Sequence, residues 1–313
     1  MNRFRGLPWR LFRFFLLIGM GYVLIFPLLY TLSASFRPLS DVMDPSIIWL
    51  PKHFTLMNFI DTYKALDYAV SLLFTVKIGV VSSLLQIASC AVVGYGFARH
   101  NFKEKKILFA LVILTIIIPP QTTMIPGYMQ FRFFNFFGLS EIIKLLTGKY
   151  FTVNLIDTVW TFYLPSIFGM GIRSGLFIYI FRQFFRGMPK ELEDSSKLDG
   201  CGALATFLRV MIPNAGAAFL TVFLFSMVWH WNDYYLSVMY LYGSMPLSVR
   251  LVGLEGTLYM LTDSLKDFNV NNPFSIVSRI QAGCLLTILP MLILYIFSQK
   301  YFTESIERTG IIG

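Results

Sequence analysis

Residues 72–97 read LLFTVKIGVVSSLLQIASCAVVGYGF, an apolar run with a single charged side chain, Lys77. Crossing a hydrocarbon core about 30 Å thick takes roughly 20 helical residues, so this run is long enough to span a membrane. The run is continuously apolar and does not alternate, which favours a helix over a barrel strand. A helix also satisfies its own backbone hydrogen bonds in lipid. The stretch therefore predicts a transmembrane helix.

Five further stretches have the same character. The six predicted spans run approximately from Phe14 to Leu32, Leu72 to Phe97, Ile107 to Pro126, Trp160 to Phe181, Ala217 to Leu236 and Ala282 to Tyr301. Pro119, Pro120 and Pro290 lie in these spans and are tolerated there as kinks. The chain has 56% hydrophobic and 14% charged residues, against roughly 25% charged residues in an ordinary soluble domain. We therefore expect an all-α membrane protein with six transmembrane helices.

Basic residues are enriched in the N-terminal tail and in residues 99–106 and 182–213. Lys and Arg flank membrane helices mainly on the cytoplasmic side, so both termini are expected to be cytoplasmic. The net charge of +9 follows from this bias better than from nucleic-acid binding. The first apolar run exceeds the about 7 to 15 residues of a signal-peptide core, which favours a retained first helix.

Motifs of nucleotide hydrolysis and metal chemistry are missing from the sequence. No Gly-x-x-x-x-Gly-Lys-Ser/Thr phosphate loop occurs, because Gly148-Lys149 is followed by Tyr150 and lacks the upstream glycine. The three histidines and three cysteines are dispersed, so neither a metal site nor a His-dependent nucleophile nor a disulfide framework is predicted. We expect no catalytic residue, no metal site and no cofactor bound by this chain.

The segment between the fourth and fifth predicted spans is long and polar. Residues 181–213 read FRQFFRGMPKELEDSSKLDGCGALATFLRVMIP. Pro189 can begin a helix, acidic side chains directly after it suit the positive helix end, and Gly200 can end the helix in a left-handed conformation. Residues 203–207 can begin a second short helix. The acidic, weakly apolar face differs from that of interfacial helices, which favours a protein partner over a membrane surface.

This segment resembles the hallmark of the permeases of binding-protein-dependent ABC importers, in particular the carbohydrate-type group that includes the smaller maltose permease. The hallmark is Glu-Ala-Ala, three residues, Gly, nine residues, Ile, any residue, Leu-Pro. In this sequence it falls on Asp194, Ser195, Ser196, Gly200, Val210, Ile212 and Pro213. The spacing fits, with Asp in place of Glu and two Ser in place of Ala. Residues 155–165, 181–193, 231–233 and 288–306 also resemble this carbohydrate group.

The resemblance implies a type I ABC importer permease (MetI-like) fold. Residues 1–70 would form the N-terminal tail, first transmembrane helix and first outer loop, and residues 71–313 a five-helix core with a coupling loop at 182–213. The ATPase-coupling residues implied are Glu191, Glu193, Asp194, Ser195, Ser196, Lys197, Leu198, Asp199, Gly200, Val210, Ile212 and Pro213.

The resemblance also implies a function and a set of partners. It implies import of a sugar or oligosaccharide across the bacterial cytoplasmic membrane by a permease that is not itself an enzyme. A second, different permease, two ATPase subunits that use ATP and Mg, and an extracytoplasmic solute-binding protein would complete the importer.

Four residues are candidates for the translocation pathway: Arg173, Trp231, Asn232 and Asp233. Arg173 lies about nine residues, or roughly 13 Å of helix, from Arg182 and hence near the membrane centre. A charge there should face protein or water, so a structural partner and a cavity-lining role both remain open. The Trp of the 231–233 triplet is more typical of a membrane-interface anchor than of a solute contact, whereas the Asn amide offers a donor and an acceptor to sugar hydroxyls.

Two other classes of function compete with this interpretation. A secondary transporter would need intramembrane carboxylates, but Asp157 and Asp233 lie toward the outer ends of their spans and no other Asp or Glu lies nearer a centre. A membrane-embedded enzyme would need a convergent catalytic set, which the sequence lacks. An ABC permease for another solute class, such as amino acids or peptides, is the nearest alternative.

Overall fold

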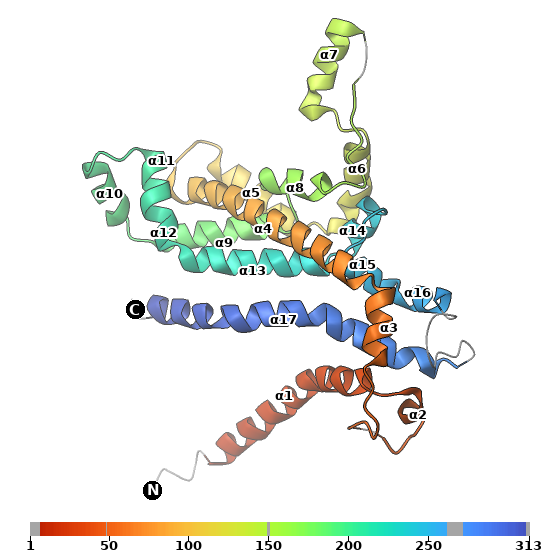
Figure 1. Ribbon diagram of the computed structural model, residues 1–313. Coiled ribbons are helices and arrows are strands. Elements are labelled where there is room, and N and C mark those ends of the chain that lie inside the picture. Colours follow the sequence, from red (N-terminus) through yellow and green to blue (C-terminus); the bar gives the residue numbers. More distant parts are fainter. Residues whose placement is uncertain (1–6, 48, 149–150, 262–271, 311–313) are drawn as a thin grey trace. The chain divides into compact units, whose positions relative to one another are not determined.

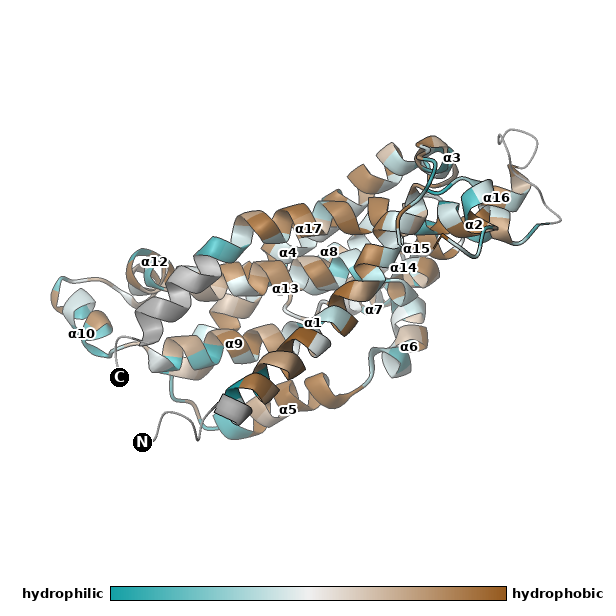
Figure 2. Ribbon diagram, turned by 90° about the horizontal axis from the view of Figure 1, so that it is seen from below, coloured by the Kyte–Doolittle hydropathy of each residue, from teal (hydrophilic) through white to brown (hydrophobic). Residues whose placement is uncertain are grey.

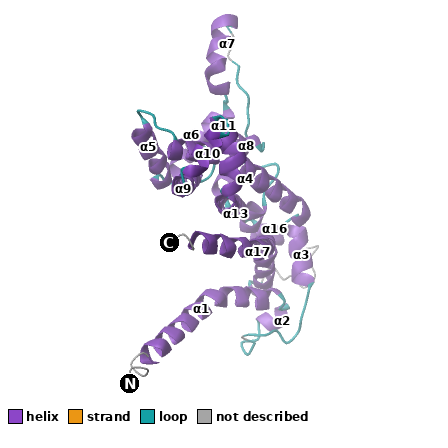
Figure 3. Ribbon diagram, turned by 90° about the vertical axis from the view of Figure 1, so that its left-hand side faces the viewer, coloured by secondary structure: helices purple, strands orange, loops and turns teal. Residues whose placement is uncertain are grey.

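The computed structural model describes residues 7–310 except 48, 149–150 and 262–271. Figure 3 shows that the regular elements of this part are helices, with one isolated β-bridge between Phe134 and Val153. The chain divides into two compact units (Figure 1), one formed by residues 1–69 and 250–290 and the other by residues 70–249 and 291–313. The predicted class of fold, an all-α membrane protein, is confirmed. The predicted domain boundary at residue 70 stays a prediction.

The first unit contains long and short helices. They are α1 (Leu7–Ser35), α2 (Leu39–Val42), α3 (Met57–Ala65), α16 (Leu254–Met260), the end of α15 (Leu247–Val252) and the first part of α17 (Phe274–Gly310). Its apolar core joins Ala65 and Leu66 at the end of α3 to Leu254, Leu258 and Ile276. Segments far apart in sequence therefore form one packed unit.

A buried ion pair crosses the first unit from α3 to α17. Arg279 donates from Nε and Nη2 to Oδ2 of Asp61 at 2.9 and 2.8 Å, and from Nη1 to the carbonyl of Ser275 at 2.8 Å. Thr62 donates its hydroxyl to the carbonyl of Arg279 at 3.0 Å. These bonds fix the register between the two helices.

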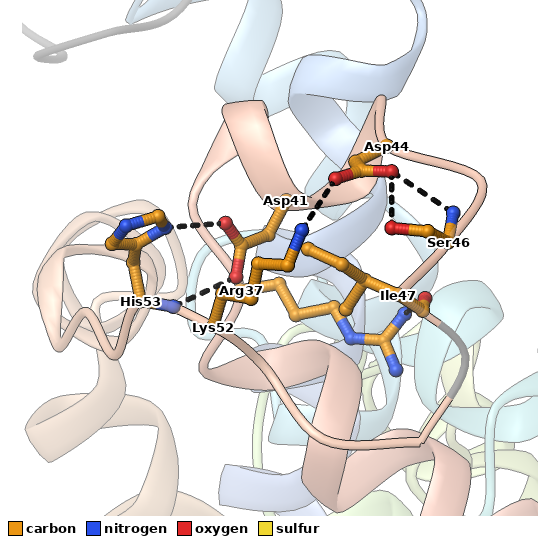
Figure 4. Close-up of polar contacts among 7 residues, drawn as sticks. All are labelled: Arg37, Asp41, Asp44, Ser46, Ile47, Lys52 and His53. Carbon is orange, nitrogen blue, oxygen red and sulfur yellow. Dashed lines mark hydrogen bonds and ion pairs between the residues drawn. The ribbon is translucent and has the colours of Figure 1, made fainter.

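The loop after α1 is organised by polar contacts (Figure 4). Asp41 accepts a hydrogen bond from the backbone N–H of His53 at 2.9 Å, and Nδ1 of that ring lies 2.8 Å from its other oxygen. Burial alone would raise the pKa of Asp41, but the hydrogen bonds from His53 outweigh it and hold the pKa below its ordinary value. Hydrogen bonds from Ser46, together with Lys52 at 3.0 Å, lower the pKa of the exposed Asp44 to about 2.

The second unit carries the remaining elements. They are α4 (Tyr68–Arg99), α5 (Lys105–Ile117), α6 (Pro120–Arg132), η1 (Phe136–Gly138), α7 (Leu139–Thr147), α8 (Trp160–Ile167), α9 (Ser174–Gly187), α10 (Glu191–Leu198), α11 (Ala203–Thr206), η2 (Phe207–Met211), α12 (Ile212–Asn214), α13 (Gly216–Asn232) and α14 (Tyr235–Tyr240). Its main core packs Phe177, Phe181 and Phe185 of α9 against α4 and α13. Gly94 permits this approach, because a Cβ there would lie 2.6 Å from Cβ of Phe181.

Three helical segments of the described chain are long and apolar enough to cross a membrane: Trp9–Ser35, Tyr68–Arg99 and Phe274–Lys300. Figure 2 shows hydrophobic residues over most of α1 and along the middle of α17. Two bent helix pairs raise the number to five if each forms one span. One pair joins α5 to α6 at 102°, because Pro119 and Pro120 interrupt the hydrogen-bond ladder.

The predicted span from Trp160 to Phe181 is wrong as one continuous helix. The α8 helix ends at Ile167 and α9 begins at Ser174. Between them Gly169 and Arg173 adopt left-handed backbone conformations, with φ of +66° and +59°. A right-handed helix cannot run through such residues, so this stretch is a broken helix.

Candidate functional site

The candidate site is the segment between α9 and α13. The α9 helix ends at Gly187, and Met188 is extended, as expected for a residue before proline. Pro189 and Lys190 then lead into α10, whose first turn contains three acidic residues at its positive end. The predicted first helix of the segment is confirmed.

A tight turn follows α10. Gly200 adopts a left-handed conformation with φ of +80°, and α11 begins three residues later. The hydroxyls of Ser196 and Thr206 lie 2.9 Å apart and are buried, which joins the two short helices. The predicted helix, turn and second helix are therefore present, and we call α10 and α11 together the α10–α11 hairpin.

The hairpin is fixed to the end of α4 by a charged network. Glu193 of α10 accepts a hydrogen bond from the hydroxyl of Tyr95 at 2.9 Å. Nε of Arg99 lies 3.7 Å from the same carboxylate oxygen, and Nη2 of Arg99 donates to the carbonyl of Met188 at 2.6 Å. Both side chains of this ion pair are largely buried. The α10 helix is thus held against α4 at its first turn.

The hairpin and the turn after it expose three leucines. Leu198 is 90% exposed and Leu204 is 71% exposed, and Leu208 in η2 is also exposed. Exposed large apolar side chains on a polar segment are typical of a protein contact. We call these three residues the leucine patch. Of these leucines only Leu198 is among the residues predicted from the sequence, although the spacing of four between Leu204 and Leu208 is a helical signal.

The predicted coupling residues divide into those that contact the protein's own chain and those that are exposed. Glu193 and Ser196 face the protein's own chain. The exposed members are Glu191, Asp194, Ser195, Lys197, Leu198, Asp199, Gly200 and Pro213, and the half-buried ones are Val210 and Ile212. Val210 belongs to the π-helical turn η2, an element frequent at functional sites. The ATPase-coupling role of the whole set stays a prediction.

The pathway candidates lie in the second unit. Arg173 sits at the start of α9, half-buried, with Cζ 4.5 Å from the ring centroid of Trp229. This cation–π contact gives the guanidinium a partner inside its own chain. The sequence analysis did not include Trp229, because its pairing with Arg173, 56 residues away, is not encoded in a local pattern.

The 231–233 triplet has three separate environments. Trp231 is buried, which differs from an interface anchor exposed to lipid headgroups. Asn232 is exposed and donates its amide to the carbonyl of Val228 at 2.9 Å. Asp233 accepts from the backbone N–H and hydroxyl of Ser237 at 2.8 and 2.9 Å, which caps α14. A solute-contacting role for the triplet stays a prediction.

A buried polar cluster around Gln86 was not foreseen. Its amide nitrogen donates to the carbonyl of Ile172 at 2.7 Å and lies 2.8 Å from the hydroxyl of Ser174. Its amide oxygen accepts from the hydroxyl of Ser226 at 2.7 Å. Gln86 therefore ties α4 and α13 to the break before α9. The sequence signal was a fully polar amide inside an apolar run.

Across the described ranges, no group of three or more His, Cys, Asp or Glu side chains could hold a metal ion. What the described segments offer instead is a helical membrane scaffold with a broken helix and a protruding helical hairpin. This combination defines a membrane permease.

The family follows from comparison with known proteins. Residues 91–308 match the model of the family described as "Binding-protein-dependent transport system inner membrane component", and the chain belongs to this family. It is therefore the multi-pass inner-membrane permease component of an ABC transport system and not the ATPase. Membership implies a complex with an ATPase, a binding protein and a partner permease.

The chain is similar along most of its length to permeases of bacterial transport systems. The chain is 28% identical over 296 residues to the arabinooligosaccharides transport system permease protein AraQ of Halalkalibacterium halodurans, covering 94% of this chain and 93% of the relative. It is 27% identical over 274 residues to the melibiose/raffinose/stachyose import permease protein MelC of Bacillus subtilis, covering 86% of each. A bacterial ABC transporter involved in the import of alginate contains a chain of similar fold, with a TM-score of 0.69, 20% identity, and coverage of 96% and 99%.

Proposed function

We propose that this chain is the permease subunit of an ATP-driven importer for a sugar or oligosaccharide. The names of the similar permeases support this substrate class, since AraQ and MelC are described as transporting oligosaccharides. In the proposed importer the chain pairs with a second, different permease. Two ATPase subunits use ATP and Mg, and an extracytoplasmic binding protein delivers the solute. Both termini of this chain are cytoplasmic.

The observation that carries the proposal is the α10–α11 hairpin. It is bound to α4 through Glu193, Tyr95 and Arg99, and it also exposes the three leucines of the leucine patch. To transmit motion from an ATPase subunit to the membrane helices, such a hairpin needs an apolar surface that contacts the ATPase. It also needs a firm attachment to a membrane helix of its own chain. We assign the leucine patch and the exposed residues of 191–200 to the contact with the ATPase.

The solute pathway is assigned to the second unit as part of the same proposal. The break between α8 and α9 brings the half-buried Arg173 into a non-helical segment. Broken helices commonly line substrate sites in transporters, because their backbone polar groups need water or ligand. The Arg173 guanidinium, the Asn232 amide and the neighbouring Trp231 and Asp233 are the groups that would face or shape this path.

Two measurements on the assembled importer test the proposal. In right-side-out vesicles loaded with ATP and supplied with the binding protein, uptake should continue when ion gradients are collapsed and stop when ATP is omitted. Leu198→Glu should weaken co-purification of the ATPase and lower solute-stimulated ATP hydrolysis, because a carboxylate would have to be buried in the contact. Leu50→Glu is the matched control, since Leu50 is also highly exposed but belongs to the first unit.

The outcomes separate the parts of the proposal. Uptake that depends on an ion gradient and not on ATP would contradict the importer function. Parental ATPase binding by both Leu198→Glu and Leu204→Glu would show that the leucine patch is not the contact. Competition of uptake by unlabelled oligosaccharides, and not by amino acids or peptides, is expected, and the reverse pattern would contradict the carbohydrate assignment.

A further inference from the structure

The α7 helix presents an apolar face that its own chain does not cover. Leu145 is 88% exposed and Leu146 is 78% exposed, and Leu139 and Ile142 are each 55% exposed. At 100° per residue these four side chains fall on one side of the helix. Lys144 lies on the opposite side. The helix is therefore amphipathic with its apolar side outward.

The helix is held rigidly at its base. Phe134 and Val153 exchange two backbone hydrogen bonds of 3.1 and 3.0 Å, which form a short antiparallel bridge below α7. Ser140 is buried and donates its hydroxyl to the carbonyl of Phe151. Gly138 and Gly148 adopt left-handed conformations at the two ends. Ser140 thus ties α7 to its own loop, while the apolar side chains of the helix stay exposed.

The direction of α7 indicates what its apolar side contacts. Figure 1 shows that α7 projects from the second unit with its axis across the direction of α4, α9 and α13, and Figure 3 again shows it beyond α6 and α8. Helices that span a bilayer are tilted by only about 20° on average from its normal. A helix that runs across them is therefore oriented parallel to the membrane plane.

Exposed apolar side chains also occur along the chain that leads to α7. None of the residues of α5 is buried, and Ile117 at its end is 71% exposed. Ile125 and Phe133 continue the exposed apolar series through α6 to the base of α7. Phe151, on the return strand of the loop, stacks on Phe136 with ring centroids 6.1 Å apart.

We propose that α7 is an interfacial helix whose apolar face inserts into the lipid surface at the end of the second unit opposite the α10–α11 hairpin. Under the orientation proposed above this is the outer leaflet, and only that assignment of the leaflet rests on the proposed function. Insertion would anchor the α6–α8 loop in the membrane plane. The arrangement matches interfacial helices in having an apolar side buried at the headgroup boundary and a polar side kept in water.

Site-directed spin labelling tests the proposal directly. The assembled importer would be reconstituted in nanodiscs of phosphatidylethanolamine and phosphatidylglycerol, with the three native cysteines of this chain replaced by alanine. Nitroxides at Leu146→Cys and Ile142→Cys should be highly accessible to dissolved oxygen, which partitions into lipid. Their accessibility to a water-soluble nickel chelate should be low. Lys144→Cys is the matched control, about 200° around the helix from Leu146, and should show the reverse preference.

Three results would overturn the proposal. Equal nickel accessibility at positions 146 and 144 would place the apolar face in water. Protection of position 146 from both reagents, with cross-linking to the second permease or to the binding protein, would assign the face to a protein contact. An oxygen preference at position 144 as strong as at 146 would show that α7 is buried in lipid on all sides. None of these results depends on ATP hydrolysis or on the identity of the solute.

Discussion

Replacing Arg279 by methionine should destabilise the first unit strongly. The guanidinium makes two hydrogen bonds to Asp61, and the two residues are only 4% and 3% exposed. Methionine keeps much of the side-chain volume but leaves the Asp61 carboxylate buried without a counter-charge. Loss of one member of a buried ion pair costs about 3–5 kcal/mol. We expect a loss of this size in the free energy of unfolding.

The assay is equilibrium unfolding of the purified chain in mixed micelles, with Arg250→Met as the control. Arg250 lies 3.8 Å from Asp67 in a pair that is much more exposed, so its loss should cost less than about 1 kcal/mol. Adding Asp61→Leu to Arg279→Met should restore most of the stability, because paired burial of charge is replaced by apolar packing. A single variant as stable as the control, or a double variant no better than the single, would refute the reasoning.

Three further predictions concern other sites. Asp41, whose pKa is held below its ordinary value, should stabilise the loop at neutral pH, and this stabilisation should disappear as the pH falls below about 4. Amide hydrogen exchange at His53 measures the stability of the loop, and Asp41→Asn should abolish its pH dependence. Gly94→Ala places a Cβ 2.6 Å from that of Phe181 and should cost about 1–3 kcal/mol, seen as a lower midpoint in thermal unfolding. Gln86→Leu leaves its partners unsatisfied and should cost at least about 1–3 kcal/mol, whereas a midpoint equal to the parent's would show that the cluster is not needed.

Local signals predicted the hairpin well. Pro189, the acidic turn after it and Gly200 each act on their own backbone neighbourhood, so their effects can be deduced without knowing what packs nearby. The long apolar helices α1, α4 and α17 were predicted for the same reason, since their composition alone fits a hydrocarbon core.

Features that depend on distant residues were not predicted. The break before α9 needs Arg173 in a left-handed conformation, which is disfavoured locally and is supported here by Gln86 from α4. The α7 helix follows α6 after only six residues, and a nine-residue amphipathic stretch is too short to be separated from a loop by pattern. The charged network at Glu193 joins residues 98 positions apart, which no local pattern encodes.

The attachment of α10 to the last turns of α4 has a mechanical consequence. The α4 helix has 32 residues, which gives a rod about 48 Å long. A tilt of about 5° around its far end would carry its Arg99 end through about 4 Å. Because Tyr95 and Arg99 bind Glu193 at that end, α10 would move by the same distance. In the proposed importer, a displacement of a few ångströms at the hairpin would therefore correspond to a tilt of α4 by only a few degrees.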